Sequence, residues 1–196
     1  MRRTMIVPLV AAGLGLAACT STTPGLASTS TSTGSQSSAA TSTAATGDGA
    51  PKVATPKNLK AIADPCQLLT PQQIQEIGAG EPRQEKSQWG EAKCSWHNDN
   101  LVVSLAPDTT QGKGLSTVYA NRDSLSNSEE TTVGGYPGLR TGKISMACSV
   151  YVGVSDNQVF LGTVTVRRDA KPEYKDRCAF AEKVAGMVLS NLPPAS

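Results

Sequence analysis

The chain has 196 residues, and its 18 Lys and Arg side chains nearly balance its 16 Asp and Glu side chains. The formal net charge of +2 at pH 7 argues against a strong electrostatic nucleic-acid binder, which would show clustered Lys and Arg. Two of the positive residues stand at the N-terminus, in a segment that we expect to be removed, so the mature protein is close to neutral. We therefore expect no nucleic-acid partner.

The first 18 residues have the parts of a bacterial signal peptide. A short basic segment at residues 1–3 precedes an apolar run at residues 5–16. That run is too short to span a membrane, which takes about 20 residues. It ends in Leu16-Ala17-Ala18-Cys19, which resembles the lipobox of bacterial lipoproteins. The resemblance implies cleavage before Cys19 and lipidation of its thiol, and the alternative is ordinary secretion with an incidental cysteine.

On this interpretation Cys19 anchors the protein to the extracytoplasmic side of the cell membrane, and residues 19–56 form its tether. The tether is rich in Ser, Thr, Ala, Gly and Pro, with only Leu26 and Val53 as larger apolar side chains. Such a segment buries too little apolar surface to offset the entropy lost on ordering, so we expect a disordered linker. It is either a bare spacer or a carrier of O-glycans. Residues 57–196 then form one folded domain.

The domain opens with signals for a helix start. The Asp-Pro pair at residues 64–65 favours a short helical turn, and Thr70-Pro71-Gln72-Gln73 has the capping-box pattern with proline at the first helical position. Gly78 is expected to end this helix, because glycine readily adopts the left-handed conformation found there.

Alternating apolar residues then predict antiparallel hairpins. Residues 93–97 and 101–105 flank an Asn-Asp-Asn turn, and residues 148–154 and 159–166 form a second hairpin. The apolar phase of the last strand changes at Gly162, where we expect a β-bulge.

Helical spacing predicts two further helices. One covers residues 115–122, and the other carries an apolar stripe from residue 178 to residue 192 and stops at Pro193-Pro194. A glycine-rich turn at residues 134–138 separates two more strands. The predicted fold class is α+β: an antiparallel sheet of hairpins with N-terminal, middle and C-terminal helices packed on one face.

Four cysteines remain once Cys19 carries lipid. An even number in an oxidising compartment indicates two disulfides, for which three pairings exist. Two of the cysteines fall on predicted strands and two at the starts of the terminal helices, so we favour Cys94–Cys148 and Cys66–Cys178. The cysteines do not have the Cys-x-x-Cys spacing that is typical of redox and metal sites. We therefore expect no metal and no cofactor.

Candidate catalytic groups are few. The only histidine, His97, falls at a strand end, and the acids at Glu129-Glu130 are typical of a solvated surface. We therefore assign no catalytic residue. Trp96 is in phase with Cys94 and is expected in the core. Tyr136, within the glycine-rich turn, is the candidate ligand-binding residue, and its alternative role is to pack inward beneath the turn.

The chain resembles the actinobacterial lipoprotein family known only as domain of unknown function 3558. The elements that carry the resemblance are the lipobox, the Ser/Thr-rich linker, Asp64-Pro65-Cys66, Cys94-Ser95-Trp96, Gly135-Tyr136, Cys148, Cys178 and Leu192-Pro193. The resemblance covers the chain from Cys19 onward. It implies a protein of the actinobacterial cell envelope and gives no catalytic residues.

We expect a membrane-anchored, non-enzymatic binding or accessory domain whose partner is an envelope protein or a small molecule. The alternative is a hydrolase or transferase that acts on envelope polymers with a carboxylate-based site. A pocket with converging acids would favour the enzyme. A shallow groove lined by apolar or aromatic residues would favour binding.

Overall fold

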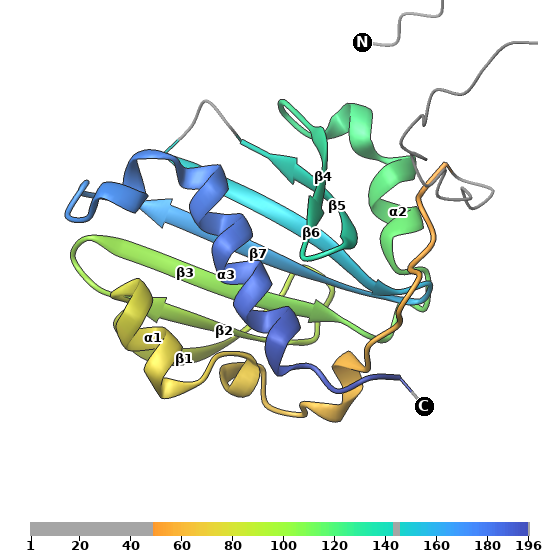
Figure 1. Ribbon diagram of the computed structural model, residues 1–196, viewed down its shortest axis with the longest axis horizontal. Coiled ribbons are helices and arrows are strands. Elements are labelled where there is room, and N and C mark those ends of the chain that lie inside the picture. The colour runs from red at the N-terminus through yellow and green to blue at the C-terminus, as the bar shows by residue number, and fades with distance from the viewer. Residues whose placement is uncertain (1–48, 143–145, 196) are drawn as a thin grey trace, which may run out of the picture. The chain divides into compact units, whose positions relative to one another are not determined.

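The computed structural model describes residues 49–142 and 146–195. The predicted signal peptide, Cys19 and most of the predicted linker lie outside the described residues. Figure 1 shows the arrangement of the elements. In chain order they are η1 (Leu59–Ala61), η2 (Pro65–Leu68), α1 (Pro71–Ile77), β1 (Glu81–Lys86), β2 (Ala92–His97), β3 (Leu101–Asp108), α2 (Leu115–Ala120), η3 (Arg122–Ser124), β4 (Glu129–Val133), β5 (Tyr136–Thr141), β6 (Ala147–Ser155), β7 (Gln158–Val166), η4 (Pro172–Lys175) and α3 (Arg177–Asn191), where η is a 3-10 helix.

The described strands join one antiparallel sheet in the order β1-β2-β3-β7-β6-β5-β4. The two predicted hairpins, β2–β3 and β6–β7, are confirmed. They lie side by side because β3 pairs with β7 along its whole length, as Figure 1 shows. The sheet is therefore open, with β1 at one edge and β4 at the other.

The main core lies on the face of the sheet that α3 crosses in Figure 1. Every second residue of β6 from Cys148 to Val154 is buried there, as the period of two in a strand requires. Helix α3 packs its apolar stripe onto these residues, and the helix residues in this core are Cys178, Phe180, Ala181, Val184, Ala185, Val188 and Leu189. The predicted C-terminal helix and its buried side are thus confirmed.

The predicted middle helix is present as α2 but packs on the opposite face. Its Leu115, Val118 and Tyr119 form a second cluster with Leu139 and Tyr151 of the sheet. Tyr151 alternates with the β6 residues of the main core, so it points to the other side. The prediction that all three helices share one face is wrong for α2. Apolar spacing shows which side of a helix is buried, but not which face of the sheet receives it.

The N-terminal helix α1 begins and ends as its sequence predicts. The Thr70 hydroxyl accepts a hydrogen bond from the Gln73 backbone N–H at 3.2 Å, and the Gln73 side chain accepts one from the Thr70 N–H at 2.9 Å. Gly78 ends the helix in the left-handed conformation with φ 66°. These local signals need no tertiary contact, and this explains why they are visible in the sequence.

The β-bulge predicted at Gly162 is wrong. Gly162 pairs in register with Leu105 on one side and Val150 on the other. The irregular register lies instead in β6, between Gly153 and Ser155. In β7 the even-numbered residues face the main core and the odd-numbered ones face the opposite side, so both faces carry apolar residues without a change of phase.

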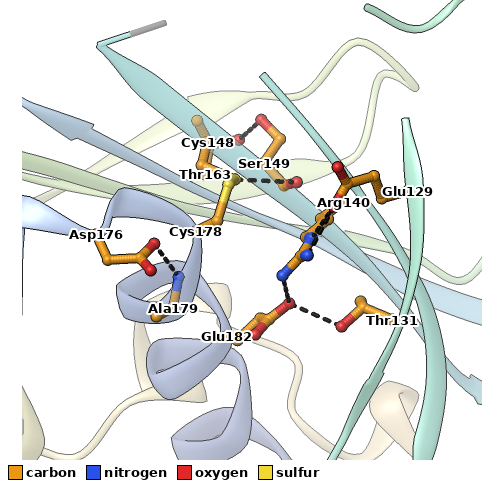
Figure 2. The surroundings of a disulfide bond; sticks show 10 residues. All are labelled: Glu129, Thr131, Arg140, Cys148, Ser149, Thr163, Asp176, Cys178, Ala179 and Glu182. Carbon is orange, nitrogen blue, oxygen red and sulfur yellow. Dashed lines mark hydrogen bonds and ion pairs between the residues drawn. A yellow bond between two sulfur atoms is a disulfide. The ribbon is translucent and has the colours of Figure 1, made fainter. Parts of the chain in front are cut away.

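Two disulfides are present, but with a different pairing from the predicted one. Cys66 of η2 is joined to Cys94 of β2, and Cys148 of β6 is joined to Cys178 of α3, with Cα–Cα distances of 5.0 and 5.1 Å. Figure 2 shows the second bridge between helix and strand. Each bridge therefore fixes a helical segment to the strand beneath it.

The sheet order explains why the predicted pairing fails. Strands β3 and β7 lie between Cys94 on β2 and Cys148 on β6. Three strand spacings amount to about 14 Å, and a disulfide requires Cα atoms within about 7 Å. The sequence shows that both cysteines are on strands but does not show which strands are neighbours.

We predict that mass mapping of the unreduced mature protein will find the Cys66–Cys94 and Cys148–Cys178 peptides. The loops that they close separate the paired cysteines by 28 and 30 residues. Replacing both cysteines of one bridge by alanine should lower the free energy of unfolding by about 3–4 kcal/mol in the chain-entropy model. Peptides that link Cys94 to Cys148 would contradict the fold described here.

Candidate functional site

A hollow with a volume of about 560 Å³ opens on the described surface. It lies between an N-terminal segment, helix α2 and the β4–β5 hairpin. Its lining residues are Pro51, Lys52, Ala54, Tyr119, Glu130, Thr131, Thr132, Gly135 and Pro137. The lining combines proline, alanine and aromatic surface with two threonines, one positive and one negative residue. Ligand sites likewise combine apolar lining with a few polar groups.

Residues 50–56, here called the strap, form one wall of the hollow. Ala50 and Val53 are buried, and the Val53 N–H donates to the Asp156 carboxylate at 3.3 Å. The C-terminal segment holds the other end, where the Ala195 N–H donates to the Pro56 carbonyl at 2.9 Å. The composition of the strap predicts that these residues belong to the linker. Their buried side chains show instead that the folded domain begins before the predicted boundary at residue 57. Val53, a large apolar residue in a polar segment, is the signal for this packing.

Tyr136 does not present an exposed ring for a ligand. It is only 8% exposed and belongs to the main core. Its hydroxyl donates to the Thr55 carbonyl of the strap at 2.7 Å, and burial raises the pKa of that hydroxyl. The assignment of Tyr136 as a ligand-binding residue is therefore corrected. It packs inward, where its ring has apolar neighbours and its hydroxyl a partner, and it holds the wall of the hollow.

The hollow is floored by the β4–β5 hairpin. Gly134 and Gly135 form its two-residue turn with φ 55° and 86°. Positive φ at both positions is the geometry of a type I′ turn, which matches the twist of the flanking strands and is most readily adopted by glycine. The glycine-rich turn predicted from the sequence is thus confirmed, and it holds Pro137 in the floor.

Tyr119 closes the hollow from α2. Burial raises the pKa of its hydroxyl to about 12, and the negative charge of Glu130 adds to the effect. The phenol therefore stays neutral at physiological pH and keeps its O–H as a hydrogen-bond donor. Its oxygen lies 3.5 Å from the Gly138 carbonyl, at the long limit for a hydrogen bond. The helical spacing in the sequence predicts that Tyr119 lies on a helix, but nothing in the sequence indicates that it faces a hollow.

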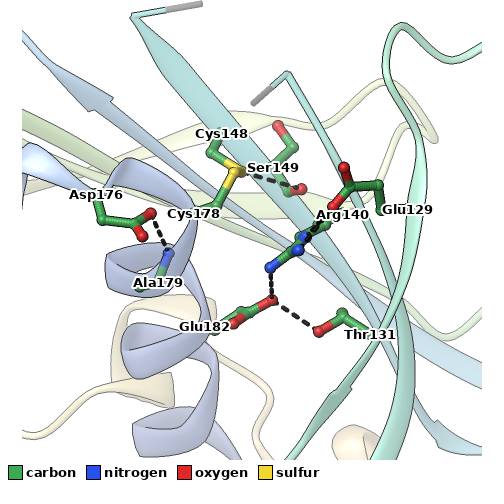
Figure 3. A network of polar contacts seen from close by, with 9 residues as sticks. All are labelled: Glu129, Thr131, Arg140, Cys148, Ser149, Asp176, Cys178, Ala179 and Glu182. Carbon is green, nitrogen blue, oxygen red and sulfur yellow. Dashed lines mark hydrogen bonds and ion pairs between the residues drawn. A yellow bond between two sulfur atoms is a disulfide. The ribbon is translucent and has the colours of Figure 1, made fainter. Parts of the chain in front are cut away.

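A polar network occupies the opposite face of the same hairpin (Figure 3). The Arg140 guanidinium donates to Glu129 at 2.6 Å and to Glu182 of α3 at 3.2 Å, and the Thr131 hydroxyl donates to Glu182 at 2.7 Å. The bond to Glu129 raises the pKa of Arg140 above its ordinary value. Because the network connects β4 and β5 to α3 (Figure 2), it fixes the hairpin that floors the hollow.

A pair of carboxylates, Asp108 and Glu91, lies at the C-terminal end of β3. Burial raises the pKa of Asp108, and the charge of Glu91 adds to it. Burial also opposes ionisation of Glu91, but hydrogen bonds from Thr110 and Thr109 outweigh it and lower the pKa. Asp108 is 5% exposed, and the four donors from the two threonines occupy the Glu91 carboxylate. The pair therefore braces a turn.

The remaining predicted residues lie away from the hollow. His97 is half-buried at the end of β2, with its Nε2 atom 3.9 Å from Glu85. Trp96 is fully buried in the main core, as predicted. Within residues 49–142 and 146–195, no group of three or more His, Cys, Asp or Glu side chains is arranged to hold a metal ion. No helix in these ranges combines the length and apolar content needed to cross a membrane.

Comparison with protein-family models gives one assignment. The model described as "Protein of unknown function (DUF3558)" matches residues 14–191. The chain belongs to this family. The match begins ahead of the predicted lipobox and includes Cys19 and all four disulfide cysteines of the DUF3558 chain. No curated protein and no solved structure matches it.

Membership of DUF3558 confirms the resemblance found in the sequence. The family description assigns neither an activity nor a location, so lipidation and the cell-envelope setting stay predictions. The function of this DUF3558 member is therefore inferred from its own hollow. Of the residues that line it, only the glycine-rich turn and Glu130 stand out in the sequence, and the composition of the strap is that of a linker.

We predict that Tyr136→Phe will loosen the strap of this DUF3558 domain. Losing the bond to Thr55 should lower the free energy of unfolding by about 1 kcal/mol and speed tryptic cleavage after Lys52. Tyr119→Phe is the matched control, because its hydroxyl makes only the long contact to Gly138. Equal sensitivity of the two variants, measured by thermal melts and timed proteolysis, would contradict the role given to Tyr136.

Proposed function

We propose that this chain is a lipid-anchored binding protein of an actinobacterial cell envelope, and that its ligand occupies the hollow between the strap and the β4–β5 hairpin. The observation that carries the proposal is the hollow itself. Its volume is about 560 Å³, and the bonds of Val53 and Tyr136 hold the strap that forms one of its walls. Binding sites are concave and largely preformed, and this hollow has both properties.

The tether supports the same proposal. Lipidation at Cys19 would leave about 30 residues before the strap. Their composition predicts a flexible chain, for which this length corresponds to an end-to-end distance of about 30 Å. Charges on lipid head groups are screened over about 8 Å. A domain held on this tether can therefore meet a partner at some distance from the membrane surface.

Binding explains the lining better than hydrolysis does. Glycoside hydrolysis requires two carboxylates on either side of the scissile bond. Glu130 is the single carboxylate among the described residues that line the hollow. The Glu91 and Asp108 pair is committed to a turn elsewhere. We therefore place the hydrolase or transferase alternative second.

The anchor is tested by replacing the lipidated residue. Cys19→Ala should release the protein from the membrane fraction or leave it as the unprocessed precursor. The reason is that buried acyl chains contribute about 0.8 kcal/mol per methylene, and two or more chains hold a protein firmly. Detergent partitioning and intact mass measure the result. A variant of mature mass that still enters the detergent phase would show that the anchor lies elsewhere.

The hollow is tested with a photocrosslinking amino acid in living cells. Placed at Lys52, on the rim, it should give discrete adducts, whereas the same amino acid at the exposed Gln72 of α1 should not. Ala54→Trp adds a large ring to an exposed strap residue that lines the hollow, so it should abolish the Lys52 adducts without loss of stability. Identical adducts at both positions, or none at either, would refute the proposal.

A further inference from the structure

Among the strands that the structure describes, β4 pairs with β5 alone, and residues of β4 line the hollow. The hairpin turn fixes which backbone groups of β4 face the edge away from β5. In a two-residue type I′ hairpin, the residues that flank the turn, Val133 and Tyr136, exchange hydrogen bonds. Bonded and non-bonded pairs then alternate along an antiparallel ladder. The N–H and C=O groups of Thr132 and Glu130 therefore point away from β5.

Pro137 supports this phase independently. It stands opposite Thr132 in the ladder. Proline has no N–H, so this pair cannot exchange hydrogen bonds and must be a non-bonded one. Two N–H and two C=O groups of β4 therefore face the edge away from β5, and both residues that carry them line the hollow.

We infer that the ligand of the hollow is an extended polypeptide segment that adds to the sheet as a strand beside β4. This inference rests on the proposed function and names the class of partner. The segment's backbone pairs with Glu130 and Thr132, which supplies affinity independent of sequence, while alternate side chains enter the pocket and supply specificity. β-branched Thr131 and Thr132 suit the centre of such a ladder.

The two sides of the hairpin define what the segment presents. Side chains on the α2 side meet Pro51, Ala54, Pro137 and the Tyr119 ring, so an apolar side chain fits there. Lys52 at the rim remains available for an acidic neighbour. Side chains on the α3 side meet the network around Arg140, where polar residues fit. The segment is therefore expected to alternate between apolar and polar residues.

A second copy of this chain fits the edge less well. If β4 of another molecule paired here, the side chains entering the α2 side would be its own Glu130 and Thr132, because Val133 faces the main core. The acidic side chain of the second copy would then enter a hollow that already holds Glu130 of the first, and like charges close together across a strand pair destabilise it. At the other end of the sheet, β1 carries Pro82 between charged residues, the pattern by which natural edges avoid pairing.

The test uses the full mature protein in detergent and a displayed library of random heptapeptides. The best binder is synthesised and each backbone amide is methylated in turn, which removes one N–H per peptide. Strand addition predicts a period of two, with methylation at alternate positions weakening binding about five- to tenfold and at the intervening positions having little effect. Uniform effects, or a period unlike two, would overturn the inference.

A matched pair of variants tests the same contact from the protein side. Thr132→Pro removes the outward N–H and Thr132→Ala keeps it, while both remove the threonine side chain. The proline variant should bind the peptide at least about fivefold more weakly than the alanine variant, and edge strands tolerate proline. Melting temperatures confirm that both are folded, and the methylation scan decides the question if the proline variant is not.

The outcomes separate this inference from the proposed function. Peptide binding that Ala54→Trp abolishes but that shows no period of two would leave the hollow as the binding site and remove strand addition. Absence of any peptide binder, together with adducts at Lys52, would point to a ligand of another class and also overturn the inference. Pairing of two copies would appear as a concentration-dependent dimer that dissociates in the Thr132→Pro variant. That result would overturn the inference that a peptide occupies the edge of β4.

Discussion

The structure depends on the packing of α3 against β6 and β7. This contact buries the apolar stripe of the helix on the centre of the sheet, and the bridge from Cys178 to Cys148 fixes the start of the helix over its strand. Glu182 of the same helix contacts the hairpin through its ion pair with Arg140 of β5. The β4–β5 hairpin lies at the margin of the sheet, where a two-stranded unit alone is marginally stable. Its position next to the strap depends on this contact with α3 as well as on the pairing of β5 with β6.

Local signals in the sequence predict most of the helices and strands. The pairing of segments far apart in the chain decides the strand order and the disulfides. The capping box at Thr70 and the β6–β7 hairpin were predicted because their causes lie within a few residues. The disulfide pairing was wrong because it depends on β3 and β7 lying between Cys94 and Cys148. Strand β1 was not predicted at all. Its sequence is Glu-Pro-Arg-Gln-Glu-Lys, every residue is exposed, and only pairing with β2 makes it a strand.

The candidate site was the least predictable part, for a physical reason. It is assembled from three parts of the chain. They are the strap, whose composition is that of a linker, Tyr119 of α2 on the second face of the sheet, and the turn at Gly135, which is more than 70 residues after the strap. None of these carries a chemical motif. Tyr136 shows the difficulty, since its type and its place in a turn suit recognition equally well. Only the distance to Thr55 shows that it supports the site from within.

The end of the strap and the residues that follow it lie beside the C-terminal segment. Ala195 bonds to the Pro56 carbonyl, Asn58 bonds to the Pro193 carbonyl, and Lys57 is bridged to Pro194. Any mechanical force applied to the chain ahead of residue 49 must therefore pass through the strap before it reaches the sheet. The bonds of Val53 and Thr55 are among those that carry that load, and they also hold one wall of the hollow. Tension on the N-terminal segment and occupancy of the hollow would then act on the same few bonds, so each would alter the other.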